Sequence, residues 1–385
     1  MNLLEAGAKI KAEIKLHVDF PEFIWSRGRV LDDRRHLAAA MKWLCLAQDA
    51  TGCGGVAASY DLILKKWGNP YRETTGYIIP TFLNYAEMTG NDEFRKRALR
   101  MGDWEVKDQL VDGSWGEVAE NDKSKTPNKN KKVFNTGQVM LGLCTLYDKT
   151  GEKKYLTPVV KAAEWLMSIQ EKDGRFEKFT TAGARTYHSR VDWPLMEVYR
   201  LTGEKKYLTV AINNLNWVLE QQNNLGWFDN CSLGIEGKPW THLLAYTIRG
   251  LWECGRISDN SRYTVAAITA AKKMLKMKLL PGTFDKNWQS TDRYSCLTGN
   301  LQIAIVWQKI YQETGEKIYL EAAERIIDLT KKTQVLEGHR EAVGAIAGSD
   351  PLWGDYCANK LINWATKFFA DTIMMKLNPE VRLSG

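Results

Sequence analysis

Three residues near the middle of the chain have side chains that could do acid–base chemistry. His188, Arg190 and Asp192 lie together in the segment HSRVD. A histidine changes its charge near neutral pH, an arginine can bind a carboxylate through two parallel hydrogen bonds, and an aspartate can donate or accept a proton. We therefore expect His188 and Asp192 to be catalytic and Arg190 to bind the substrate.

His188 also departs from a pattern that the chain keeps elsewhere. Thr75 and Thr136 each lie fourteen residues before a segment that begins Thr-Gly, and each stands where an apolar helix is expected to start. His188 takes the same position before the Thr-Gly segment at Thr202. Such a departure from local consistency often marks function. A histidine that only caps the helix would give the same pattern, so both interpretations remain open.

Further candidates lie in or beside the segments that connect the expected helices. Carboxylates there could form the pair that a glycosidase needs, and a tyrosine could move a proton at a sugar carbon. On these grounds we expect catalytic roles for Glu73, Glu117 and Tyr246. Aromatic and polar side chains could bind a sugar by stacking and hydrogen bonding; the candidates are Trp193, Trp240, His242, Asn135, Trp353 and Asp355. Taken singly, each could instead be a core aromatic or a solvated polar group.

Two short segments recur along the chain and indicate a repeat architecture. The first begins Thr-Gly, as in TGNDEF, TGEKKY and TGEKIY; its glycine can end one helix and its acidic residue can begin the next. The second joins a glutamine to a glycine, as in QDATGCGG, QLVDGSWG and QEKDGRF, and follows an amphipathic helix. The sequence therefore predicts repeated hairpins, each with one amphipathic and one more apolar helix.

The repeats place twelve helices along the chain, six amphipathic ones alternating with six buried ones. Their expected starts are Arg35, Gly76, Glu93, Asn135, Tyr155, His188, Tyr207, Thr241, Tyr263, Ser295, Ile318 and Asn359. Six antiparallel hairpins close best as a ring, because closure removes the exposed ends of an open array. We expect an all-α toroid in residues 35–385, with residues 1–34 as an N-terminal extension packed against it.

The spacing of these repeats and the number of helices resemble those of the (α/α)6 toroid superfamily. The segment KAAEWLMSIQEKDGRF resembles the QW repeat of squalene-cyclase-like toroids, and the TGEKKYL turns resemble those of six-hairpin glycosidases and their uronate-processing relatives. The resemblance implies a single (α/α)6 domain with a carbohydrate as its substrate.

The long connections of such a ring all lie at the rim where the inner helices begin. Long loops in a compact domain are usually functional, and helix N-termini favour negative charge. The net charge of +7 also favours an acidic partner. The densest basic run, from Lys123 to Lys132, is either a solvated loop or a segment that steers an anionic ligand.

These observations favour an enzyme that acts on an acidic, uronate-containing oligo- or polysaccharide. Hydrolysis by two carboxylates is slightly favoured over a lyase or epimerase reaction by histidine or tyrosine. One alternative is an isoprenoid or terpene cyclase, which the QW-like segments favour, although the DxDD motif of class II cyclases is absent. The other is a non-catalytic saccharide-binding subunit of surface-polysaccharide biosynthesis.

Composition excludes several other classes. The seven cysteines are scattered without a CxxC pair, so we expect neither a zinc ribbon nor a disulfide framework, and no metal or cofactor. The basic residues are spread along the chain, which is not typical of nucleic-acid binding. No apolar run approaches the length of a membrane span, and the N-terminal segment lacks the apolar core of a signal peptide. We therefore expect a cytoplasmic protein.

Overall fold

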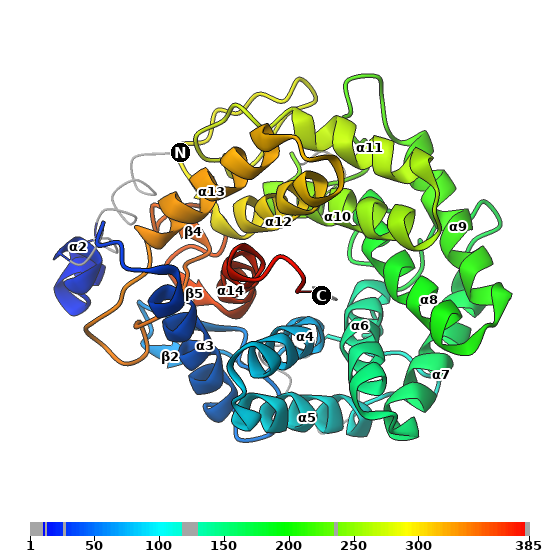
Figure 1. Cartoon of the computed structure of the whole chain (residues 1–385), viewed down its shortest axis with the longest axis horizontal. Helices are drawn as coiled ribbons and strands as arrows, with labels where there is room; N and C mark the ends of the chain where they lie inside the picture. The colour runs from blue at the N-terminus through cyan, green and yellow to red at the C-terminus, as the bar shows by residue number, and fades with distance from the viewer. Residues whose placement is uncertain (1–10, 12–13, 26–27, 118–129, 235–237, 382–385) are drawn as a thin grey trace.

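A computed structural model describes residues 11, 14–25, 28–117, 130–234 and 238–381. Within these ranges the main helices form two concentric layers (Figure 1). The outer layer consists of α3 (Asp33–Asp49), α5 (Asp92–Lys107), α7 (Lys153–Ile169), α9 (Lys205–Glu220), α11 (Ser261–Lys272) and α13 (Lys317–Lys331). The inner layer consists of α4 (Arg72–Thr89), α6 (Val133–Thr150), α8 (Ser189–Thr202), α10 (Thr241–Ile257), α12 (Leu297–Thr314) and α14 (Asn363–Leu377). Short helices α2 (Glu22–Trp25) and η1 (Thr186–His188) complete the set.

The inner helices close into a ring. Each inner helix contacts the next along the chain, and α14 contacts both α4 and α3 at the closure. The inner helices are buried along most of their length, as the nearly continuous apolar segments predict. The (α/α)6 toroid predicted from the repeats is therefore confirmed, and each of the twelve predicted starts lies within about four residues of the observed one.

The Thr-Gly segments join inner to outer helices as tight turns. Gly90, Gly151, Gly203 and Gly315 all have φ near +70°, the left-handed conformation that glycine adopts without strain. The threonine before each glycine donates its hydroxyl to a carbonyl four residues earlier, as Thr89 does to Tyr85 at 2.7 Å. The repeated Thr-Gly segment therefore marks the end of a helix, and it can be recognised directly in the sequence.

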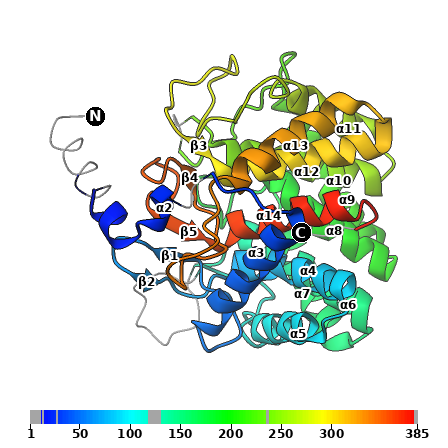
Figure 2. The same cartoon turned by 60° about the vertical axis from the view of Figure 1, so that its left-hand side comes forward.

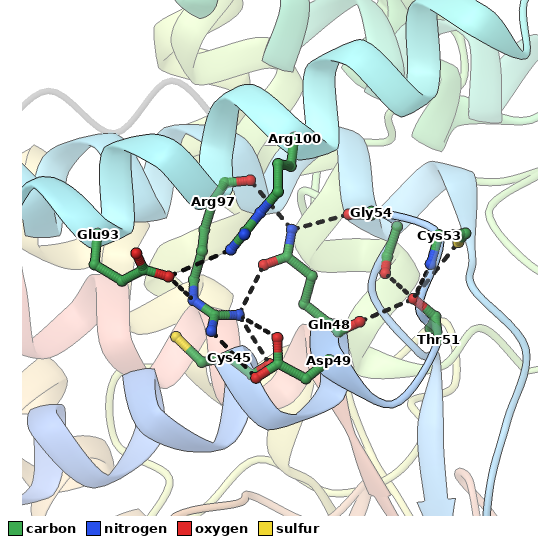
Figure 3. Close-up of polar contacts among 10 residues, drawn as sticks. Cys45, Gln48, Asp49, Thr51, Cys53, Gly54, Glu93, Arg97 and Arg100 are labelled. Carbon is green, nitrogen blue, oxygen red and sulfur yellow. Dashed lines mark hydrogen bonds and ion pairs between the residues drawn. The ribbon is translucent and has the colours of Figure 1, made fainter.

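The repeated glutamines fasten neighbouring outer helices to each other. Gln48 Nε2 donates to the carbonyl oxygen of Gly54 in its own loop at 2.9 Å and to that of Arg97 in α5 at 3.1 Å (Figure 3). Gln109, Gln170 and Gln222 make the same pair of bonds to the next outer helix.

The last glutamine of this kind closes the outer layer. Gln334, which follows α13, donates to the carbonyl oxygens of Gly344 and of His36 in α3, at 2.7 and 3.2 Å. The pair of glutamine hydrogen bonds that joins consecutive outer helices therefore also joins the last outer helix to the first.

Short strands, which the sequence pattern did not predict, tie the loops together at one end of the toroid. β1 (Ser59–Asp61) pairs antiparallel with β2 (Lys66–Trp67) and β5 (Lys360–Ile362), and β3 (Ser295–Cys296) pairs with β4 (Ser349–Asp350). Figure 2 shows these strands gathered on one side of the helices. Strands of two or three residues that pair across the chain leave no periodic signal in the sequence.

Part of the N-terminal segment packs against the ring. Leu16 and Phe20 are buried in the same apolar core as the helices, and Glu22 accepts hydrogen bonds from the backbone and the ring of His339. The division of the chain at residues 34 and 35 stays a prediction. In the part of the chain that the structure describes, no helix combines the length and apolarity that crossing a bilayer requires.

Candidate active site

A cavity of about 280 Å³ lies at the end of the toroid where the inner helices begin. It is lined by the first turns of α4, α6, α10 and α14 and by the loops and short helix around them. The lining residues are Tyr71, Glu73, Glu117, Phe134, Asn135, Thr181, Tyr187, Leu233, Trp240, His242, Leu243, Tyr246, Tyr356, Cys357 and Trp364. Six of the residues proposed from the sequence are among them: Glu73, Glu117, Asn135, Trp240, His242 and Tyr246.

Glu73 lies in the cavity wall between two tyrosine hydroxyls. The Tyr71 hydroxyl donates to its Oε2 at 2.7 Å, and the Tyr246 hydroxyl lies 3.4 Å from its Oε1. Burial raises the pKa of Glu73 to about 7; the negative charge of Glu117 acts in the same direction, while the two tyrosine hydroxyls and Arg190 act against it. A carboxyl group with this pKa is partly protonated at neutral pH and can act as a general acid.

Glu117 is the second carboxylate of the cavity and lies in a different environment. Its side chain is 48% exposed, and Lys132 Nζ lies 3.9 Å from its Oε2. The backbone amide of Glu117 donates a hydrogen bond to the carbonyl oxygen of Asn130 at 3.1 Å, and this bond holds the backbone in place at Glu117. The cavity therefore holds one partly buried carboxyl group and one more exposed carboxyl group, and such a difference in environment can separate the acid and base roles of a pair.

Tyr246 and His242 come from adjacent turns of α10. His242 Nδ1 lies 2.7 Å from Gln302 Nε2, and its ring centroid lies 4.2 Å from that of Tyr246. Burial lowers the pKa of His242 to about 3, and the charge of Arg190 adds to this effect. The imidazole is therefore neutral at physiological pH, with Nε2 as the ring nitrogen available to a ligand.

Aromatic rings form much of the cavity wall. Trp240 packs edge-on against Tyr356 at 5.4 Å between ring centroids, and Trp364 Nε1 donates to the Tyr356 hydroxyl at 2.9 Å. Asn135 adds a buried amide whose Nδ2 lies 3.5 Å from the carbonyl oxygen of Gly116. Aromatic faces beside a few polar groups are typical of a site for a sugar ring.

His188 and Asp192 do not line the cavity, which corrects the expectation that they meet there with Arg190. The His188 ring is buried against Phe176 and Tyr187, and burial lowers its pKa to about 3. Asp192 is fully buried toward the outer layer, where its Oδ2 accepts a hydrogen bond from Asn214 of α9 at 2.7 Å. Burial raises the pKa of Asp192 well above its usual range.

Helix geometry explains this separation. Residues two positions apart on a helix point about 200° apart, so Arg190 faces the centre of the ring when Asp192 faces α9. The Arg190 Nε donates to Gln138 Oε1 of α6 at 3.0 Å, and its guanidinium lies beneath the Tyr246 ring. Trp193 lies against the guanidinium groups of Arg190 and Arg249 rather than in the cavity.

The remaining sequence candidates lie close to the cavity without lining it. Trp353 is half-buried and Asp355 is exposed, in the loop that carries Tyr356. Of the basic run, residues 123–129 lie outside the described part of the chain, while Lys131 forms an ion pair with Asp112 and Lys132 lies beside Glu117. Among the described residues, no group of three or more His, Cys, Asp or Glu side chains is arranged to hold a metal ion.

Several lining residues were missed by sequence reasoning. Tyr71, Phe134 and Tyr356 lie one or two positions from residues that were proposed, so aromatic neighbours of the proposed polar residues were the available signal. Trp364 was missed because α14 begins at residue 363 rather than near 359, which brings this tryptophan into the first turn at the rim.

A family model and several solved structures match this chain. A family model described as "Beta-L-arabinofuranosidase, GH127 catalytic domain" matches residues 73–266, just over half of the 385 residues, and this range includes both cavity carboxylates and Tyr246. No protein of curated function matches the sequence.

The solved structures similar to this chain include two glycoside hydrolases and a sugar epimerase. An unsaturated glucuronyl hydrolase from Bacillus sp. GL1 is 13% identical with a TM-score of 0.69, over 91% of this chain and 98% of that one. A cellobiose 2-epimerase from Bacillus thermoamylovorans B4167 is 13% identical with a TM-score of 0.71, over 89% and 98%. A family 88 glycosyl hydrolase from Bacteroides vulgatus is 12% identical with a TM-score of 0.63, over 90% and 99%. At such identities the likeness concerns the fold.

Proposed function

Because the chain belongs to the GH127 β-L-arabinofuranosidase catalytic-domain family, we propose that it hydrolyses a glycosidic bond with Glu73 as proton donor and Glu117 as its carboxylate partner. The family makes the chain a carbohydrate-active enzyme, and a saccharide its substrate. The observation that carries the hydrolase assignment is the presence of two carboxyl groups in one cavity, one of them with a pKa of about 7.

The proposed reaction assigns a separate task to each group. Glu73 gives its proton to the glycosidic oxygen as the bond to the leaving sugar breaks, and the Tyr71 and Tyr246 hydroxyls stabilise the carboxylate that remains. Glu117 acts on the anomeric side, either by activating water or by attacking the carbon directly. Wide spacing of the two carboxyl groups gives inversion and close spacing gives retention.

A neutral sugar fits the cavity better than an acidic one. The described lining contains two glutamates and no lysine or arginine. The expectation of a uronate rested in part on Arg190 as the group that binds its carboxylate, and this guanidinium lies beneath the floor of the cavity. A carboxylated sugar would therefore lie beside like charges without a cation from the described lining to bind it.

Epimerisation or elimination is the second candidate, supported by the neutral His242 beside Tyr246. An imidazole with a pKa of about 3 is a weak base, and this favours the hydrolase.

A substrate panel separates these possibilities. Purified protein would be incubated with neutral aryl pyranosides and furanosides, an unsaturated uronyl disaccharide, a uronate polymer and cellobiose. We expect release of a neutral terminal sugar, lost in Glu73→Gln. If only the uronyl substrate is cleaved, the substrate is an acidic sugar, as the sequence predicted. An unsaturated product or an epimer, with no new reducing end, would overturn the hydrolase assignment.

A further inference from the structure

Arg190 is buried beneath the cavity floor with most of its hydrogen-bonding capacity unused. Its side chain is inaccessible to solvent, and Nε donates to Gln138 Oε1. Nη1 and Nη2 have no hydrogen-bond partner among the described residues. Burying a guanidinium in this way is costly, so its surroundings must offset the cost in another way.

Aromatic rings surround the guanidinium instead. The Arg190 Cζ lies 4.9 Å from the ring centroid of Tyr246 and 5.8 Å from that of Tyr77. Trp193 and Phe368 lie at 5.5 and 5.9 Å. A cation over aromatic faces is attracted to them, and the attraction is stronger where water is excluded.

Of the two tyrosines beside Arg190, Tyr246 contacts Glu73 directly and Tyr77 contacts the Tyr246 hydroxyl. The Tyr246 hydroxyl lies 3.3 Å from the Tyr77 hydroxyl and 3.4 Å from Glu73 Oε1. On its cavity side the Tyr246 ring contacts His242 at 4.2 Å and Phe134 at 4.9 Å. Arg190 therefore packs against the Tyr246 ring on the side away from the cavity, and the hydroxyl of this ring contacts Glu73.

We propose that Arg190 is a positioning residue, which holds the Tyr246 and Tyr77 rings from beneath the cavity so that the Tyr246 hydroxyl stays directed at Glu73. The proposal rests on the proposed role of Glu73 in hydrolysis. In this proposal Arg190 does not touch the substrate, whereas the sequence predicted that it binds the substrate.

The charges around Glu73 give the proposal a measurable signature. Tyr71, Tyr246 and Arg190 favour the ionised carboxylate, and Glu117 opposes it, as does burial. Removing Arg190 takes away a positive charge and loosens a hydroxyl donor. Both changes favour protonated Glu73, so its titration should move to higher pH.

The test compares Arg190→Met with Arg190→Lys and with Arg249→Met as a matched control. Arg249 is equally buried and also lies against Trp193, and its Nε forms an ion pair with Glu253 of the same helix. We expect Arg190→Met to lower kcat about tenfold or more with KM changed less than about twofold, because the acid is misplaced while the cavity wall is kept. Arg190→Lys should recover part of kcat, and Arg249→Met should keep the wild-type pH profile.

A measurement without substrate decides the role of Arg190 separately. The Glu73 carboxyl carbon would be followed by NMR titration in protein labelled with ¹³C-glutamate, and its signal assigned with Glu73→Gln. Arg190→Met should raise the titration midpoint and Arg190→Lys should return it toward the wild-type value. An unchanged or lower midpoint, or the same rise in Arg249→Met, would overturn the proposal.

Two outcomes need their own interpretation. If Arg190→Met fails to fold, Gln138→Leu removes the acceptor of the Arg190 Nε bond and should raise the midpoint by a smaller amount; no rise would overturn the proposal. If the wild-type protein hydrolyses no glycoside, the proposed function fails, while the NMR titration still accepts or rejects the positioning role.

Discussion

The hydrogen bond between Tyr71 and Glu73 gives a prediction with a defined sign. The Tyr71 hydroxyl donates to Glu73 Oε2 at 2.7 Å, and this bond stabilises the ionised form of the carboxyl group. Replacing Tyr71 with phenylalanine keeps the ring in the cavity wall and removes the donor. The pKa of Glu73, about 7 in the native protein, should therefore rise.

The size of the effect follows from the energy of such a bond. A hydrogen bond to a charged group contributes about 1.5–3 kcal/mol, and one pKa unit corresponds to about 1.4 kcal/mol, so the midpoint should rise by about one to two units. A general acid must be protonated to act. The alkaline limb of kcat/KM should move to higher pH by the same amount, while the acidic limb stays in place.

The assay is the pH dependence of kcat/KM for the best substrate of the panel, with the NMR titration of Glu73 as an independent measurement. Tyr207→Phe is a matched control, because the Tyr207 hydroxyl donates to Glu164 at the same 2.7 Å in the outer helices. Its profile should equal that of the native protein. An alkaline limb that stays in place or moves to lower pH in Tyr71→Phe would refute the assignment of Glu73 as the acid.

Three further predictions concern the charge of the cavity and the stability of the ring. Glu117→Gln removes a negative charge beside Glu73 and should lower the midpoint of the Glu73 NMR titration; a higher midpoint would contradict the charge interaction. Because the pKa of Asp192 is raised on folding, its contribution to stability is present below its usual pKa of 3.8 and is lost as pH rises toward the folded value. Asp192→Asn should therefore reduce the fall of Tm with rising pH, and parallel Tm–pH curves would show that Asp192 is not buried in its neutral form. Gln334→Leu leaves the carbonyls of His36 and Gly344 without their donor and should cost about 1–3 kcal/mol in urea unfolding; an unchanged midpoint would mean that the bond does not help to close the ring.

Close packing between inner helices leaves no room for a side chain at two of their glycines. A Cβ atom at Gly76 would lie 2.6 Å from Val139 Cα, and one at Gly142 would clash with the backbone oxygen of Gly76. The absence of side chains at these positions lets α4 and α6 approach closely, and this fixes the spacing of Glu73 and Asn135 at the two helix starts.

The amino-acid sequence by itself determined the helices, their order and their closure. Helical periodicity and the Thr-Gly stops act over a few residues, so each can be read along the chain, and the repeated glutamines are visible as a recurring segment. The sequence also placed Glu73, Asn135 and Trp240 at the rim, because each precedes or begins an inner helix.

Only the tertiary structure decided which of these residues meet. A small change in where a helix begins turns a side chain toward or away from the cavity, and this separates Arg190, which faces inward, from Asp192, which faces α9. The pKa of Glu73 likewise depends on burial and on charges contributed by α4, α8, α10 and the loop of Glu117. These elements lie far apart in the chain and are adjacent only in the closed ring, because electrostatic interactions and desolvation depend on distance in space.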